Sequence, residues 1–76
     1  GAAYGHDYAA YLRLLAGLRS RVLREVRDPV LRRGVFRRLA GPEFAAVCAR
    51  QGEAGGRRAM LAVLREAVRL QAGVAS

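Results

Sequence analysis

The stretch DPVLRRGVFRRLAGPEF, residues 28–44, decides the fold because it contains two helix starts only thirteen residues apart. Asp28-Pro29 is typical of a helix start, since the aspartate caps free amides and proline needs no amide partner at the first helical position. Gly41-Pro42 indicates that one helix stops and another begins. Between these two starts, apolar side chains at four-residue spacing predict one buried helical face: Leu31, Val35 and Leu39.

Helical patterns continue on both sides of this stretch, and no segment has the alternation of a strand. A first helix is expected over about residues 8–27, with Asp7 as its N-cap. Its apolar residues recur in three- and four-residue steps: Tyr8, Tyr11, Leu12, Leu15, Leu18, Val22 and Val26. A third helix is expected over about residues 42–51 and a fourth over about residues 57–72.

Glycines set the expected breaks between helices. Residues 52–56, GEAGG, contain three glycines in five positions and predict a flexible linker. Gly34 costs about 1 kcal/mol inside a helix, so the second segment is predicted either as one helix or as two short ones. The fold class is therefore all-α, a compact bundle of four to five short helices in a single domain over residues 1–76. Residues 1–6 are expected to be disordered or foreign to the domain.

The composition is rich in arginine. Among the 76 residues, 53% are hydrophobic, the formal net charge is +8, and all fourteen basic residues are arginine. A chain this short has a marginal core, so a binding partner can contribute to its stability. Lysine, asparagine and isoleucine are absent, which is typical of a GC-rich coding sequence. The arginine excess therefore has two interpretations, a functional one and codon bias.

The single cysteine, Cys48, excludes an intramolecular disulfide. No apolar run approaches the eighteen residues of a membrane span, and no signal peptide is evident. We therefore expect an intracellular, cytoplasmic protein that does not bind membranes.

The residues needed for catalysis are scarce. Threonine is absent, only two serines occur, and Cys48 and His6 are the only possible Cys/His pair. Cys48 lies on the apolar side of its helix, where a buried, inert role is far more frequent. No metal-ligand spacing or phosphate-binding loop is present. We expect no catalytic residues, no cofactor, no metal and no small-molecule substrate.

The candidate site is a cluster of arginines. Arg33 and Arg37 are expected to point away from the apolar face of the second helix. Arg57 and Arg58 are expected to open the fourth helix, where a cation opposes the helix dipole and an external partner would explain it. The full predicted partner-binding set is Arg32, Arg33, Arg37, Arg38, Arg57 and Arg58. Such a cluster suits nucleic acid or an acidic protein face. Without base-reading Asn, Gln, Ser or Thr beside these arginines, nucleic acid would be bound non-specifically.

The order of these features resembles the caspase-recruitment domain of the death-fold superfamily over residues 23–64. The resemblance rests on an Arg- and Leu-rich first helix, on Asp28-Pro29-Val30-Leu31, on Arg33-Gly34-Val35-Phe36, on Gly41-Pro42-Glu43-Phe44 and on Arg57-Arg58-Ala59-Met60-Leu61. Bacterial effector-associated domains are similar over residues 28–73. The chain departs from the pattern, since it has too few residues for the full second helix and for a sixth helix.

The resemblance implies an adaptor domain that recruits other domains in signalling or defence and has no enzymatic activity. Combined with the basic charge, it predicts an acidic partner domain, either homotypic or heterotypic. Homotypic assembly is disfavoured by self-repulsion at low salt. Two alternatives remain open: a small basic helical protein that binds nucleic acid without sequence specificity, and a helical subunit that self-assembles or joins a larger complex.

Overall fold

The computed structural model describes residues 2–75, and it describes side chains for residues 8–74. Three helices account for this part of the chain: α1 (Ala2–Glu25), α2 (Pro29–Leu39) and α3 (Pro42–Ala75). The predicted all-α class is confirmed. Three helices are found instead of four to five, because α3 covers both the third and the fourth predicted helices and α2 passes through Gly34 without a break.

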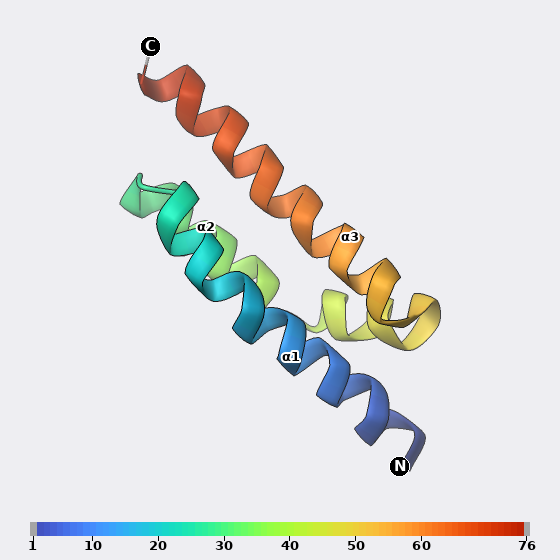
Figure 1. Cartoon of the computed structure of the whole chain (residues 1–76). Helices are drawn as coiled ribbons and strands as arrows, with labels where there is room; N and C mark the ends of the chain where they lie inside the picture. The colour runs from blue at the N-terminus through green and yellow to red at the C-terminus, as the bar shows by residue number, and fades with distance from the viewer. Residues whose placement is uncertain (1, 76) are drawn as a thin grey trace.

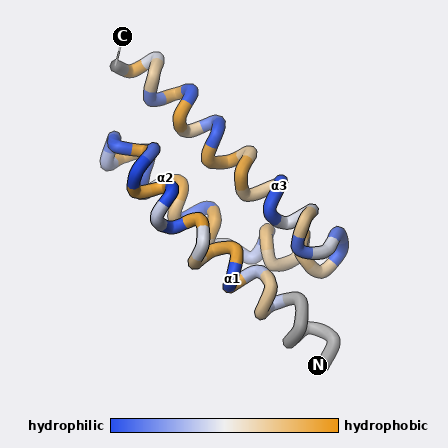
Figure 2. Tube along the Cα trace, viewed as in Figure 1, coloured by the Kyte–Doolittle hydropathy of each residue, from blue (hydrophilic) through white to orange (hydrophobic). Residues whose placement is uncertain are grey.

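The helices form an elongated molecule of 48 × 16 × 16 Å. Figure 1 shows α1 and the long second part of α3 side by side and running in the same direction. An Arg13–Glu53 ion pair joins them near one end, and a hydrogen bond from Gln71 Nε2 to the Glu25 carbonyl joins them near the other. Helix α2 runs back along both. Figure 2 shows apolar and polar residues interspersed along each helix, as expected where only one face is buried.

The helix boundaries in the middle of the chain follow the predicted caps. Asp28 accepts a hydrogen bond of 2.9 Å from the Leu31 amide, and Pro29 occupies the first turn of α2. α3 starts at Pro42. The first helix differs from the prediction at both ends. It begins at Ala2, so residues 2–6 are helical and Asp7 lies within the helix instead of capping it, and it ends at Glu25.

The predicted linker over residues 52–56 is wrong except at its first residue. Only Gly52 leaves the helical conformation, with φ 77° and ψ −179°, and the remaining four residues are helical. This backbone conformation is accessible almost only to glycine. Gly52 therefore kinks α3 so that residues 42–51 and the long second part of the helix take different directions.

Gly55 and Gly56 are buried packing positions, not flexible ones. A side chain at position 56 would overlap Sγ of Cys48 and would lie 3.4 Å from Cδ1 of Leu14. A side chain at position 55 would overlap Cβ of Gln51. The absence of side chains at these two positions lets the two parts of α3 and α1 approach one another closely.

The core lies along the axis of the molecule, where the three helices meet. Helix α1 is covered on two sides, since it packs against both α2 and α3. Each part of the chain contributes buried apolar side chains: Tyr11, Leu14, Leu18, Val22 and Val26 before α2, Val35 and Leu39 from α2, and Phe44, Val47, Cys48, Met60, Val63, Leu64 and Ala67 from α3.

Side chains satisfy the backbone groups at the α1–α2 junction. The side-chain oxygen of Gln71 accepts hydrogen bonds from the amides of Arg27 and Asp28. Arg32 donates 2.8 Å and 2.9 Å hydrogen bonds to the carbonyls of Val26 and Leu23, which follow or close α1. Helix ends leave such groups without intrahelical partners. The Gln71 bonds therefore hold the turn between α1 and α2 against α3, and the Arg32 bonds join the start of α2 to the end of α1.

One buried hydrogen bond connects α1 to the end of α2. The hydroxyl of Tyr11 donates to the Leu39 carbonyl at 2.6 Å, and both residues are buried. Burial raises the pKa of Tyr11 above its ordinary value, and Tyr8 and Cys48 contribute in the same direction.

Two Gly→Ala substitutions should have opposite effects on stability. Gly56→Ala should destabilise the fold by about 1–3 kcal/mol through overpacking against Cys48. Gly34→Ala should stabilise it by about 0.4–1 kcal/mol, because position 34 is helical and exposed. The added Cβ would lie more than 4 Å from the side chains and the other helices around it. Urea unfolding followed by circular dichroism measures both. A neutral Gly56→Ala would contradict the close packing described here.

Tyr11→Phe should lower the free energy of unfolding by about 1–2 kcal/mol, since the buried Leu39 carbonyl loses its partner. It should also change the alkaline response. A tyrosine whose pKa is higher in the folded state contributes full stability below its unfolded pKa of about 10 and loses it as the pH rises through the folded value. The variant should therefore lose less stability than the parent between pH 9 and 11, measured by urea unfolding. Equal losses would show that Tyr11 does not titrate differently in the folded state.

Candidate interaction surface

The four predicted arginines on α2 differ in whether they have a bonding partner within the chain. Arg33 and Arg37 are exposed on the outer side of α2, two helical positions that share one face. Arg38 lies toward α3 and comes within 3.9 Å of Glu43. Arg32 is partly buried and binds backbone carbonyls. Of these four arginines, Arg33 and Arg37 are therefore the two with no partner among the described side chains.

The two predicted arginines of α3 lie elsewhere. Arg57 lines a groove between α1 and α3, together with Arg13 and Arg21. Arg58 lies seven residues before Arg65, so both occupy the outer face of α3. The structure therefore does not gather all six predicted arginines on one face. Contrary to the prediction, Arg57 and Arg58 do not open a helix, because the second part of α3 begins before them, directly after Gly52.

Most arginines have no acidic partner within the described part of the chain. Four pair with carboxylates: Arg13 with Glu53, Arg21 with Glu25, Arg38 with Glu43 and Arg69 with Glu66. The Arg69 guanidinium holds the pKa of Glu66 below its usual range through hydrogen bonds. Apart from these four and Arg32, nine of the fourteen arginines remain without an ion pair among residues 8–74. This surplus is available to an external anion.

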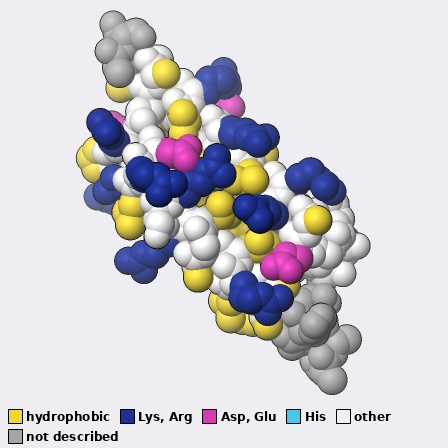
Figure 3. All heavy atoms as spheres, in the orientation of Figure 1, with side chains coloured by type: hydrophobic (Ala, Val, Ile, Leu, Met, Phe, Trp, Pro, Cys, Tyr) yellow, Lys and Arg dark blue, Asp and Glu magenta, His cyan; other side chains and the backbone are white. Residues whose placement is uncertain are grey.

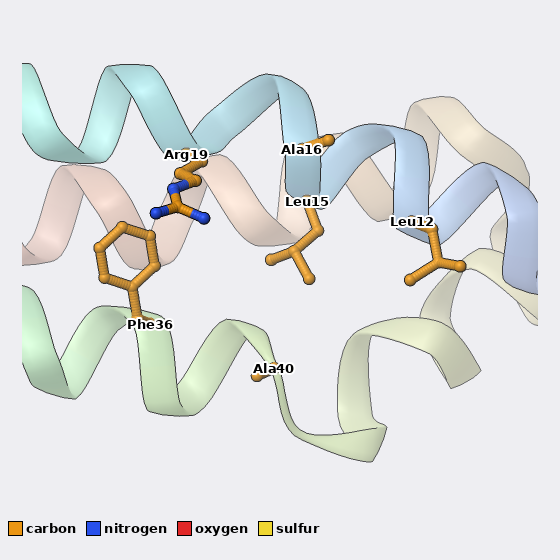
Figure 4. Close-up of a pocket in the computed structure, with 6 residues that line it drawn as sticks. All are labelled: Leu12, Leu15, Ala16, Arg19, Phe36 and Ala40. Carbon is orange, nitrogen blue, oxygen red and sulfur yellow. The ribbon is translucent and has the colours of Figure 1, made fainter.

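An apolar groove of about 550 Å³ runs between α1 and α2 (Figure 4). Leu12 and Leu15 project into it from α1, and Phe36 projects from α2. Arg19 and Phe36 point toward one another across one end of the groove. The remaining lining residues, Ala16 and Ala40, are small. The groove is therefore apolar, with a single guanidinium inside it.

This groove continues past Ala40 into a second hollow between α1 and the start of α3. Its lining is again mostly apolar and small: Tyr8, Tyr11, Ala40, Gly41, Pro42, Ala45 and Ala46. Tyr8 is 51% exposed and Leu12 is 45% exposed, so both present large apolar surfaces to solvent. Among the side chains of residues 8–74, no acidic one lines either part. We call the two parts together the α1–α2 groove.

Arginine and apolar side chains share the surface around these helices. Figure 3 shows blue arginine side chains dispersed among yellow apolar ones over one face, with few acidic side chains between them. Arg33 precedes Phe36 by three residues and Arg37 precedes Ala40 by three, so both lie along the α2 edge of the groove. The groove therefore combines an apolar centre with a cationic edge.

Sequence reasoning missed the contribution of α1 to this surface. The apolar stripe of the first helix includes both Tyr8 and Tyr11, yet only Tyr11 is buried. Arg19 had no predicted role, yet it lines the groove. The available signal was the number of apolar residues in the stripe, since α2 and α3 leave two of them, Tyr8 and Leu12, exposed. Tyr4, the third tyrosine, lies outside the residues whose side chains the structure describes.

Chemically reactive groups do not converge in the described residues. Cys48 is 1% exposed, as predicted for a buried apolar position. His6 lies outside the residues with described side chains. Among the residues described, no three His, Cys, Asp or Glu side chains are placed to hold a metal ion. None of the described helices is both long enough and apolar enough to cross a membrane.

Comparison with known proteins gives no relative for this surface. The chain matches no protein-family model, no curated protein and no solved structure.

Proposed function

We propose that the chain is a non-enzymatic protein–protein interaction module that recruits an acidic partner through the arginines beside the α1–α2 groove. The supporting observation is the combination of an uncovered apolar groove with arginines that have no acidic partner among the described residues. Arg19 lines the groove, and helical spacing places the exposed Arg33 and Arg37 beside Phe36 and Ala40 on its α2 side. Guanidinium groups pair well with carboxylates, so an acidic protein surface fits this edge.

The apolar groove favours a protein partner over nucleic acid. Binding a phosphate backbone uses positive charge and leaves large apolar side chains exposed to water. Tyr8, Leu12 and Phe36 would gain from burial only against another apolar surface. Interfaces between proteins typically combine such an apolar centre with a polar rim.

The resemblance of residues 23–64 to caspase-recruitment domains supports the same proposal. Domains of the death-fold superfamily recruit partner domains and perform no chemistry. We propose the same class of role here, an adaptor in cytoplasmic signalling or defence. Recruitment would depend on charge, because the partner must match a surface that carries a net excess of arginine.

Charge reversal on α2 should weaken binding of an acidic probe. We expect Arg33→Glu/Arg37→Glu to weaken binding of a fluorescein-labelled 20-residue polyglutamate at least tenfold, because two carboxylates would replace two partner-facing guanidiniums. Fluorescence anisotropy at 50 mM salt measures this. Arg58→Glu/Arg65→Glu is the matched control, with the same change in net charge on the outer face of α3. It should weaken binding by less than about threefold. Equal losses in both variants would show that the α2 edge is not the partner surface.

A second candidate function, non-specific nucleic-acid binding, is favoured by the groove between α1 and α3. Arg13, Arg21 and Arg57 line it beside Gly17, where the absent side chain leaves open space. Two acids partly offset this charge, since Glu53 pairs with Arg13 and Glu25 with Arg21. A phosphate backbone fits such a groove through charge alone.

If the second candidate is correct, binding of a 20-base-pair DNA duplex should weaken steeply with salt, with a slope of roughly −0.9 per phosphate contacted. Arg13→Gln/Arg57→Gln should reduce that slope, whereas Arg33→Gln/Arg37→Gln should leave it nearly unchanged. Anisotropy at several salt concentrations measures both slopes. A flat salt response of the parent protein would exclude this candidate.

A further inference from the structure

We infer that the α1–α2 groove is the seat of a single amphipathic helix supplied by the partner, with apolar residues on one face and carboxylates at its edge. This inference rests on the proposed function and specifies the form of the acidic partner.

The shape of the groove suits one helix. On α1 its lining extends from Tyr8 to Arg19, which corresponds to about 16 Å, or three helical turns. Leu15 and Phe36 are half-buried against the core, whereas Leu12, Ala16 and Ala40 are exposed along the groove. A groove of this length and lining can receive large apolar side chains that fall every three or four residues along a partner. An amphipathic helix presents such a row.

The secondary structure of the chain favours a helical occupant over an extended one. An extended peptide needs a sheet edge that can pair with its amides and carbonyls. No strand occurs among the described residues 2–75. A helix satisfies its own backbone groups and needs only side-chain contacts. The groove between two helices supplies side-chain contacts and little else.

The charges around the groove select an acidic helix. Arg19 lines the groove, and no acidic side chain does so among residues 8–74. Helical spacing places Arg33 and Arg37 beside its α2 side. A helix with glutamates beside its apolar row would place carboxylates against these arginines. A basic helix would meet like charges at the same positions.

The same charges disfavour a second copy of this chain as the occupant. Each copy carries a formal net charge of +8. The exposed apolar residues elsewhere on the surface, such as Val30 and Leu70, have arginines as close neighbours on their own helices, Arg33 and Arg69. Seating such a face in the groove would bring arginine against arginine.

The test uses two labelled peptides of eighteen residues and identical composition. The first carries leucines at positions i, i+3, i+4, i+7 and so on, with glutamates on the remaining face. In the second the same residues are rearranged so that the leucines form no helical row. In fluorescence anisotropy at 150 mM salt, we expect the first peptide to bind the intact protein at least tenfold more tightly than the second.

A substitution in the groove should remove this preference. Ala16→Glu places a carboxylate on the groove lining and should weaken binding of the first peptide at least tenfold. Ala62→Glu is the matched control. Both alanines are exposed and helical, and both have an arginine three residues later, Arg19 and Arg65. The control should stay within threefold of the parent. Circular dichroism and urea unfolding of both variants establish that they remain folded.

The other possible results would each overturn one part of the inference: the groove, the acidic partner, both, or the identity of the occupant. Equal binding of the two peptides, with loss in Arg33→Glu/Arg37→Glu, would overturn the groove and leave the proposed function standing. If the first peptide bound equally well with lysines in place of its glutamates, the partner would not need to be acidic, and the groove would remain the binding site. No binding of either peptide would overturn both. A dimer in light scattering that Ala16→Glu converts to a monomer would identify a second copy as the occupant and overturn the inference.

Discussion

The structure depends on one close approach, in which Gly56 lies directly against Cys48. Leu14 of α1 lies at the same point, so three segments meet where no side chain larger than hydrogen fits. Gly52 supplies the change of direction that makes this contact possible. Once the two parts of α3 are held together here, its long second part is directed along α1. The positions of α2 and of the α1–α2 groove follow from that alignment.

Local rules predicted the parts of the fold that depend on neighbouring residues. Asp28-Pro29 and Gly41-Pro42 mark the helix starts because capping involves atoms only a few residues apart. The four-residue spacing of Val35 and Leu39 predicted their shared buried face for the same reason. The all-α class follows from such local signals taken together.

Distant contacts decided what local rules could not. Composition does not distinguish a glycine that bends the chain, such as Gly52, from one that allows close packing, such as Gly56. Gln71 looked like an ordinary helix residue, yet it binds the backbone more than forty residues away. For the same reason, local rules could not predict which arginines lie on the same face of the molecule. Helical spacing predicted which side Arg33 faces, but only the arrangement of helices shows that Arg57 lies in a groove between α1 and α3.

The arginines differ in role according to what surrounds them. Arg32 completes the backbone hydrogen bonding at the end of α1, and Arg21 pairs with Glu25 on its own helix at 2.6 Å. Others, such as Arg33 and Arg37, have no acid within reach among the described residues. Some arginines therefore have structural roles, and others carry positive charge that no described acid neutralises. Beside the apolar groove, this charge would favour acidic partners among those that can bury apolar surface there.

The parallel course of α1 and the second part of α3 has a mechanical consequence. The two ends of the described chain, at Ala2 and Ala75, lie at opposite ends of a molecule 48 Å long (Figure 1). Tension applied through these ends would draw α1 and α3 past each other along their axes. Such a load is a shear that strains the whole interface at once, from the Arg13–Glu53 ion pair to Gln71. A hairpin of antiparallel helices, pulled from two adjacent ends, would instead separate one contact at a time.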